Sequence, residues 1–198
     1  VEIGSWKGKS TICLAKGALK GPGTTVYAID PHVGSKEHFS EEGGVWTFES
    51  FKKNMAACGV EGSVIPIVQT SQEAVRNWRT PVEILWIDGS HEYADVRKDF
   101  NEWFPHVIPG GWILFHDSKW PGVRRVLWEE FYLCSKVGRV RRIEDTTFAQ
   151  KVETAKWWQK LWNRCALRYY QLRQALKRRR RRWRKRWKKH FSAFRRKA

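Results

Sequence analysis

The sequence is poor in the features that mark metal-thiolate, secreted or membrane-spanning proteins. Its four cysteines, Cys13, Cys58, Cys134 and Cys165, show none of the C-x-x-C spacings of thiolate metal sites. No charged-then-apolar leader opens the chain, and no apolar run is long enough to cross a bilayer. We therefore expect a protein of a reducing compartment, the cytoplasm. The chain starts at Val1 without Met, so we also expect elements upstream of it to be missing.

Acidic residues are nearly absent from the last quarter of the chain. Residues 151–198 contain 20 Lys and Arg and one acidic residue, Glu153, whereas residues 1–150 have a net charge of −1. This contrast predicts a near-neutral domain over residues 1–152 and a polycationic segment over residues 153–198. Any anionic partner is expected to bind the second segment.

Short apolar runs alternate with longer helix-like segments through the first 150 residues, which is typical of a parallel sheet covered by helices on both faces. The pattern predicts an α/β fold with a doubly wound, mostly parallel sheet and an antiparallel C-terminal hairpin. A turn at Pro109 to Gly111 is expected to precede the fifth strand. The expected strands are 1–3, 25–29, 64–68, 83–87, 112–115, 139–143 and 147–152, and the expected helices are 10–19, 48–58, 71–78, 93–104 and 122–132.

The first motif is a Gly-containing loop between the first strand and the first helix, Val1-Glu2-Ile3-Gly4-Ser5-Trp6-Lys7-Gly8-Lys9-Ser10. Glycines permit close approach of a ligand, and the helix N-terminus offers free N–H groups to an anion. The spacing is G-x-x-x-G and lacks the G-x-G-x-x-G of dinucleotide folds, so a pyrophosphate cradle for NAD is not indicated. The motif fits a nucleotide-like cofactor, and equally an ordinary tight turn.

The second and third motifs are polar residues that directly follow strands. Asp30 ends the second strand, where a carboxylate can bind both hydroxyls of a ribose or simply form a turn. Asp88 follows the fourth strand, and His116 and Asp117 follow the fifth. In a parallel sheet these three residues converge on one edge, where they could hold a hard divalent cation or activate a hydroxyl. A helix cap at Asp88 and loop hydration at His116 and Asp117 are the alternatives.

In this order, the motifs resemble those of the class I S-adenosylmethionine-dependent methyltransferases, and closely those of methyltransferase family 24. The resemblance covers residues 1 to about 152 and is carried by residues 1–10, 27–31, 84–93, 107–117 and 121–123. It implies a Rossmann-like fold and S-adenosyl-L-methionine as cofactor. By resemblance, the methionine part of the cofactor would be surrounded by Glu2, Gly4, Ser5 and Gly8, the ribose would be bound by Asp30, and the adenine would lie near Thr70 and Ser71.

The same resemblance implies the reacting centre. The region of Asp88 and His91 would face the methyl donor and acceptor. Related sugar and macrolide O-methyltransferases hold a metal through acidic residues after the fourth and fifth strands, places that Asp88 and Asp117 occupy here, with His116 beside them. Magnesium or another divalent cation is therefore a candidate cofactor. Ser90 stands where some relatives have an aspartate that acts as the base, which makes His91 the better candidate for the general base here.

Apolar residues of the basic segment recur mostly at intervals of three, four and seven, which predicts one long amphipathic helix over residues 154–194. Its Lys, Arg and Trp content favours an anionic membrane surface. Nucleic acid is a second reading, because a run of basic residues from Lys177 to Arg182 precedes Trp183. A solvated tail is the third. The apolar positions are Trp158, Leu161, Trp162, Cys165, Tyr169, Leu172, Leu176, Trp183, Trp187, Phe191 and Phe194.

The function that we expect is methylation of a hydroxyl on a small-molecule, sugar or glycolipid-like acceptor. The alternatives are an RNA methyltransferase and a noncatalytic binding module that acts through its basic helix. A peripheral position at the inner face of the membrane is the alternative to a purely cytoplasmic location.

Overall fold

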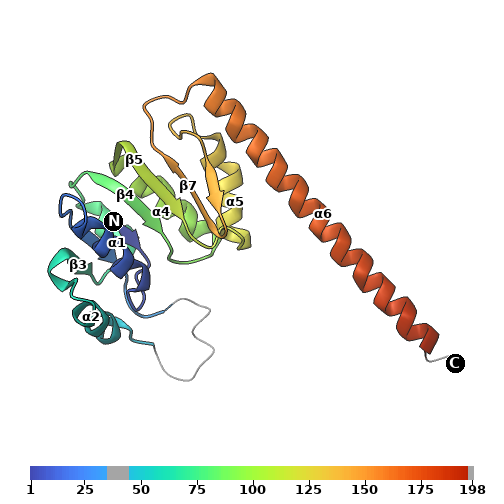
Figure 1. Cartoon of the computed structure of the whole chain (residues 1–198), viewed down its shortest axis with the longest axis horizontal. Coiled ribbons are helices and arrows are strands. Elements are labelled where there is room, and N and C mark those ends of the chain that lie inside the picture. Colours follow the sequence, from blue (N-terminus) through green and yellow to red (C-terminus); the bar gives the residue numbers. More distant parts are fainter. Residues whose placement is uncertain (35–44, 196–198) are drawn as a thin grey trace.

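The computed structural model describes residues 1–34 and 45–195, and Figure 1 shows them as a central sheet flanked by helices, with one long helix at the C-terminal end. The sheet has seven strands in the order β3-β2-β1-β4-β5-β7-β6. The five strands β1 to β5 run parallel, and β7 and β6 are antiparallel additions beside β5. The strands are β1 (Glu2–Ile3), β2 (Val26–Ile29), β3 (Val64–Ile67), β4 (Val82–Ile87), β5 (Val107–Phe115), β6 (Arg141–Ile143) and β7 (Thr146–Gln150).

Helices cover both faces of the sheet, because successive residues of a buried strand point to opposite sides. On β2, Ala28 packs into a cluster with Phe51 and Met55, whereas Ile29 packs into a larger cluster with Phe100 and Trp103. The predicted doubly wound, mostly parallel fold is confirmed. The α-helices are α1 (Lys9–Leu19), α2 (Phe48–Ala57), α3 (Ser71–Arg76), α4 (Tyr93–Trp103), α5 (Pro121–Glu129) and α6 (Trp157–Arg195), with single 3₁₀ turns at η2 (Glu61–Ser63), η3 (Phe104–His106) and η4 (Phe131–Leu133).

The fifth strand differs from the prediction. It begins at Val107 rather than at Trp112, so Pro109, Gly110 and Gly111 lie inside the strand instead of forming a turn before it. The register between β4 and β5 shifts between Val82 and Ile84, which marks a bulge. A Cβ on Gly111 would stand 2.9 Å from the carbonyl oxygen of Glu83, so the neighbouring backbone leaves room only for glycine.

The C-terminal part also differs in its boundaries. Helix α5 stops at Glu129, and the residues predicted to continue it form the 3₁₀ turn η4. The hairpin is present, with β6 and β7 joined at Glu144 and Asp145. Its turn contains Glu144 with a φ of 48°, the left-handed conformation that reverses the chain.

Helix α6 contacts the domain through its N-terminal half. Asn163 is buried, where its amide accepts a hydrogen bond from the Val140 N–H (2.8 Å) and donates one to the Gly138 carbonyl (2.9 Å). Leu167 joins the main core one turn further along. Beyond this contact the helix extends away from the sheet (Figure 1). Among the described residues, no helix combines the length and apolar composition of a bilayer span.

Candidate functional site at the carboxyl edge of the sheet

The carboxyl ends of the parallel strands lie side by side and are joined by backbone hydrogen bonds. Past the end of β1, the Gly4 N–H donates to the Ile29 carbonyl on β2 (2.9 Å). Asp88 N–H donates to the Ile3 carbonyl (2.8 Å), and His116 N–H donates to the Ile87 carbonyl (3.0 Å). The loops that carry the predicted site residues are therefore neighbours at one edge, where open α/β sheets bind ligands.

Backbone strain is concentrated at this edge. Trp6, His32 and Asp117 have φ values of 47°, 57° and 48°, and they follow β1, β2 and β5 respectively. Within residues 1–34 and 45–195, Glu144 of the hairpin turn is the other non-glycine residue with a positive φ. Such conformations cost free energy and persist where the surrounding structure imposes them, which is common at functional sites.

The Gly-containing loop needs its first glycine for a close contact with the loop after β4. Gly4 has a φ of 86°, and a Cβ there would stand 2.4 Å from the carbonyl oxygen of Asp88. Gly8, with a φ of 87°, caps α1. Between them Ser5 is buried, and its hydroxyl makes no hydrogen bond within the described part of the chain. A buried hydroxyl at this position is suited to a polar ligand group.

Asp30 ties two of the strained loops together. One oxygen of its carboxylate accepts the Trp6 N–H (2.7 Å), and the other accepts the His32 N–H (2.6 Å). Each carboxylate oxygen has a second lone pair, so these bonds leave acceptor capacity for a ligand hydroxyl. Asp30 thus organises this edge through hydrogen bonds within the protein.

Glu2 lies inside the protein beneath the same loop. It is fully buried and accepts a hydrogen bond from the Thr11 hydroxyl, which connects β1 to α1. Burial raises the pKa of this carboxyl to about 7. Its other carboxyl oxygen, Oε1, makes no hydrogen bond within the described part of the chain.

The structure places Thr70 and Ser71 at the start of α3, just past β3, whose end is joined to Asp30 by the hydrogen bond from the Asp30 N–H to the Ile67 carbonyl (3.1 Å). Thr70 forms a capping box with Glu73, since its hydroxyl accepts the Glu73 N–H and the Glu73 carboxylate accepts the Thr70 N–H. Ser71 is buried and donates its hydroxyl to Asp99. Both hydroxyls are thus occupied by contacts within the protein.

The remaining predicted residues form a chain of carboxylates and imidazoles at the tips of β4 and β5. His116 Nδ1 lies 2.9 Å from an Asp88 oxygen and 3.4 Å from an Asp117 oxygen. His91 Nε2 lies 3.1 Å from the same Asp117 oxygen. Burial raises the pKa of Asp88 above its ordinary value, and the nearby His116 acts in the opposite direction. Asp88, His116, Asp117 and His91 are called the acid–histidine cluster below.

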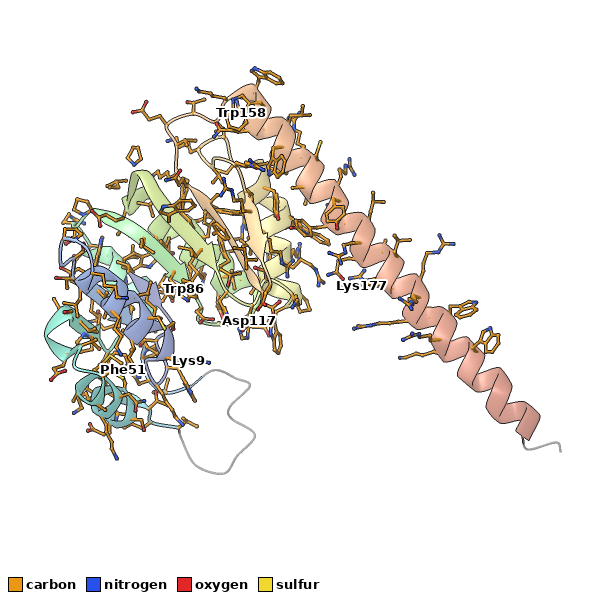
Figure 2. The ribbon with its side chains drawn as sticks, in the orientation of Figure 1. Lys9, Phe51, Trp86, Asp117, Trp158 and Lys177 are labelled. Carbon is orange, nitrogen blue, oxygen red and sulfur yellow. The ribbon has the colours of Figure 1, made fainter. Side chains whose placement is uncertain are left out.

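Aromatic rings fix the two imidazoles of this cluster. The Trp120 ring stacks on His91 with 4.6 Å between ring centroids, and the Trp86 ring stacks on His116 at 6.0 Å. Figure 2 shows Trp86 and Asp117 in the same region of the sheet, far from Trp158. The sequence motifs did not identify Trp86 or Trp120. The feature of the sequence that could have pointed to them is their position, since Trp86 lies two residues before Asp88 and Trp120 lies three residues after Asp117.

Gly122 is a further residue whose role the sequence did not reveal. It lies in the first turn of α5, and a Cβ there would stand 2.1 Å from the carbonyl oxygen of His91. The absence of a side chain lets α5 pack directly against the loop that carries His91. Gly122 therefore helps to set the position of the imidazole.

Three residues of the cluster could hold a metal ion. One ligand atom each from Asp88, His116 and Asp117 fall within 4.8 Å of one another. Two carboxylates and one imidazole form a donor set that first-row divalent metals accept, whereas magnesium prefers oxygen alone. The residues present thus fit a divalent cation, and the histidine favours a metal such as manganese or iron(II) over magnesium.

A hollow of about 380 Å³ opens beside His116. It is lined by residues of β5 and of the hairpin that pairs with it, namely Leu114, His116, Ile143, Glu144, Asp145, Thr146 and Phe148. A larger hollow of about 540 Å³ lies at the opposite edge of the sheet, around Pro105 to Pro109 and Lys151. Size alone would select the second, but only the first adjoins the acid–histidine cluster.

The fold is that of the open α/β sheets, a class of protein in which nucleotide-like cofactors bind at the carboxyl edge of the sheet. Residues 1–118 match the family described as "Methyltransferase domain", and the chain belongs to that family. The resemblance to methyltransferase family 24 is thereby confirmed.

The chain matches only part of the length of its known relatives. Over 122 residues, 60% of the chain, it is 30% identical to the uncharacterized protein y4gI of Sinorhizobium fredii. The chain spans 13% and 34% of the lengths of two curated relatives that it matches.

Solved structures show the same fold. The O-methyltransferase NovP matches with a TM-score of 0.61 at 15% identity, over 77% of this chain and 71% of NovP. The O-methyltransferase TomG from Streptomyces achromogenes, solved in complex with SAM, matches with a TM-score of 0.56 at 19% identity, over 76% and 71% of the two chains.

Proposed function

We propose that this domain binds S-adenosylmethionine and transfers its methyl group to a hydroxyl of a small-molecule or sugar acceptor. The acid–histidine cluster carries this proposal, because it places two imidazole–carboxylate pairs at the edge of the sheet beside the Gly-containing loop. Membership of the methyltransferase-domain family and the fold shared with NovP and TomG support it.

The cofactor site is proposed to lie across the loops after β1 and β2. The buried Ser5 hydroxyl and the helix N-terminus at Gly8 suit the carboxylate of the methionine part. Asp30 suits the ribose hydroxyls through its second pair of acceptor sites. The backbone at Thr70 and Ser71 is proposed to border the adenine, since their hydroxyls are engaged elsewhere.

Methyl transfer requires in-line alignment and removal of the acceptor proton. We assign the proton transfer to His91. With Nε2–H donated to Asp117, the basic lone pair of the imidazole lies on Nδ1, and Asp117 stabilises the ring when it gains the proton. Trp120 and Gly122 hold the ring in its plane and position.

A divalent cation bound by Asp88, His116 and Asp117 would lower the pKa of a coordinated acceptor hydroxyl. In either case the hollow beside His116 is the proposed acceptor pocket. It has both polar and apolar lining residues, which suits a ring that carries hydroxyls.

Transfer of labelled methyl groups from S-adenosylmethionine to a panel of phenols, sugars and nucleotide sugars tests this proposal. We expect labelled product with the natural chain and a loss of at least about 100-fold with His91→Ala, since general-base catalysis contributes ~10²–10⁴-fold. His106→Ala, which changes a histidine at the opposite edge, is the matched control. No binding of S-adenosylmethionine in isothermal titration would instead support a noncatalytic module.

RNA is the second candidate acceptor, and the charge of α6 favours it. The same labelled donor with total RNA as acceptor separates the two candidates. If the label enters RNA and none enters the small-molecule panel, RNA replaces small molecules and sugars as the acceptor class.

A further inference from the structure

Helix α6 presents two different faces along its N-terminal half. The face toward the domain contains Asn163 and Leu167, which are buried, and Ala166 and Tyr170, which are partly buried. The spacing of three to four residues between them keeps these side chains on one side of the helix. Beyond Gln174 every side chain that the structure describes, residues 175–185 and 187, is exposed. The helix is therefore docked on one side at its start, and its described side chains are exposed further along.

Exposed apolar side chains run along nearly the opposite side of the helix. At 3.6 residues per turn, their mean direction lies about 150° around the helix axis from the docked face. Leu172 is 64% exposed, Trp183 60% and Trp187 54%, although these are side chains that proteins usually bury. This outward stripe consists of Trp158, Leu161, Cys165, Tyr169, Leu172, Leu176, Trp183 and Trp187. The side chains of Phe191 and Phe194, predicted to continue it, lie outside the described part.

Arginines flank the outward stripe on both sides. On the same helical projection, Arg168 and Arg179 lie along one border, and Arg173 and Arg180 lie along the other. The Arg173 guanidinium already stands 5.7 Å from the centre of the Tyr169 ring. Long basic side chains at the borders of an apolar stripe can reach headgroup phosphates while their stems stay in the apolar layer.

We infer that the outward stripe is a binding surface for an anionic lipid bilayer, on which α6 lies parallel to the membrane. Charge complementarity identifies the partner, since residues 151–198 carry a net charge of +19. The apolar stripe gives the mode of binding, because its tryptophans and leucines enter the boundary between headgroups and acyl chains. This inference does not depend on the chemistry at the carboxyl edge.

Two other occupants fit the stripe less well. A nucleic-acid backbone would pair with the arginines but would leave the long apolar stripe in water. A second copy of the helix could cover the stripe, because its spacing is close to a heptad repeat. That pairing would bring two strongly basic segments together with few acidic residues to neutralise them.

The geometry leaves this surface accessible. The stripe faces away from the side that contacts the domain, and the helix separates from the domain before Lys177 (Figure 2). A 39-residue helix is about 58 Å long, at 1.5 Å per residue. Its C-terminal half can thus lie on a flat surface without moving the domain.

Co-sedimentation of the full chain with vesicles tests the inference. The vesicles are phosphatidylcholine alone or an equimolar mixture with phosphatidylglycerol, across a salt series up to about 0.5 M, where charges are screened beyond a few ångströms. We expect binding to the mixed vesicles that weakens with salt but persists at the top of the series. The paired change Trp183→Gln and Trp187→Gln should weaken this salt-resistant binding about tenfold or more, because it removes buried apolar area.

The paired change Trp183→Phe and Trp187→Phe is the matched control, and it should retain binding within about threefold because the apolar area is largely kept. Circular dichroism verifies that both variants remain helical. No binding to the mixed vesicles, or equal binding by the Gln and natural chains at high salt, overturns the inference. So does binding to RNA that exceeds vesicle binding and falls log-linearly with salt. A dimer in sedimentation equilibrium that the Gln variant abolishes would assign the stripe to self-association.

Discussion

Asp30 offers the sharpest test of the proposed cofactor site, because the structure gives it two separable roles. Its carboxylate holds the N–H groups of Trp6 and His32, and it is proposed to bind the ribose hydroxyls as well. Asp30→Ala therefore removes two hydrogen bonds to a charged acceptor inside the protein. Each is worth about 1.5–3 kcal/mol, so the free energy of unfolding should fall by ~3–6 kcal/mol if the loops do not rearrange.

A loss of affinity in this variant is ambiguous by itself, since loosened loops also bind ligands more weakly. The ambiguity is removed by a cycle of two proteins and two ligands, S-adenosylhomocysteine and its analogue without ribose hydroxyls. If Asp30 binds the ribose, the natural chain should bind the analogue about 10- to 100-fold more weakly. The Asp30→Ala variant should bind both ligands with similar affinity.

Isothermal titration supplies the four affinities, and thermal unfolding of each protein supplies the stability. The matched control is Asp145→Ala, which changes an aspartate of the hairpin turn that ion-pairs with Lys119. This control should leave the natural ratio between the two ligands intact. An equal ratio in the natural and Asp30→Ala chains would mean that Asp30 only organises the loops, and the ribose would need another partner.

The remaining predictions concern proton transfer, metal and pH. His91→Ala should lower turnover far more than cofactor affinity, and an unchanged rate with an identified acceptor would reassign the base. Exhaustive chelation should abolish activity if a cation acts at Asp117 and its neighbours, whereas full activity after chelation would leave these carboxylates with structural roles. Burial raises the pKa of Asp99 from its usual 3.8 to about 7, so the folded state holds a proton that the unfolded chain releases. Stability should therefore fall as pH rises between these two values, and urea titrations of Asp99→Asn at about pH 5 and about pH 8 should show a weaker dependence.

The sequence predicted which polar residues follow the strands better than it predicted where the strands begin and end. Glycine, aspartate and histidine stood directly after apolar runs, and parallel pairing alone suffices to bring such positions together at one edge. The fifth strand was placed too late, because Pro109 to Gly111 satisfied the rules for a turn equally well. Only the register shift beside Glu83 shows that these residues form a bulge.

The contacts within the site lay beyond sequence reasoning for a related reason. Asp117 contacts both His91 and His116 because its left-handed backbone sets the direction of its side chain. Such a backbone is usually signalled by a glycine, and the sequence has none at this position. The stacking of Trp120 on His91 likewise joins residues from two different loops. Thr70 and Ser71 show the converse, since their hydroxyls are engaged in a helix cap and a core contact that the resemblance did not imply.

Helix α6 shows why composition and packing must be considered together. Charge counting divides the chain near residue 152, yet Asn163 and Leu167 are as firmly buried as residues of the sheet. The two buried hydrogen bonds of Asn163 would be exchanged for hydrogen bonds to water if the helix left the domain, at a net cost of about 0.5–1.5 kcal/mol each. The first half of the helix is therefore held in place by the domain. That anchorage fixes the direction of the outward stripe, so whatever the stripe binds is bound at a defined orientation to the carboxyl edge.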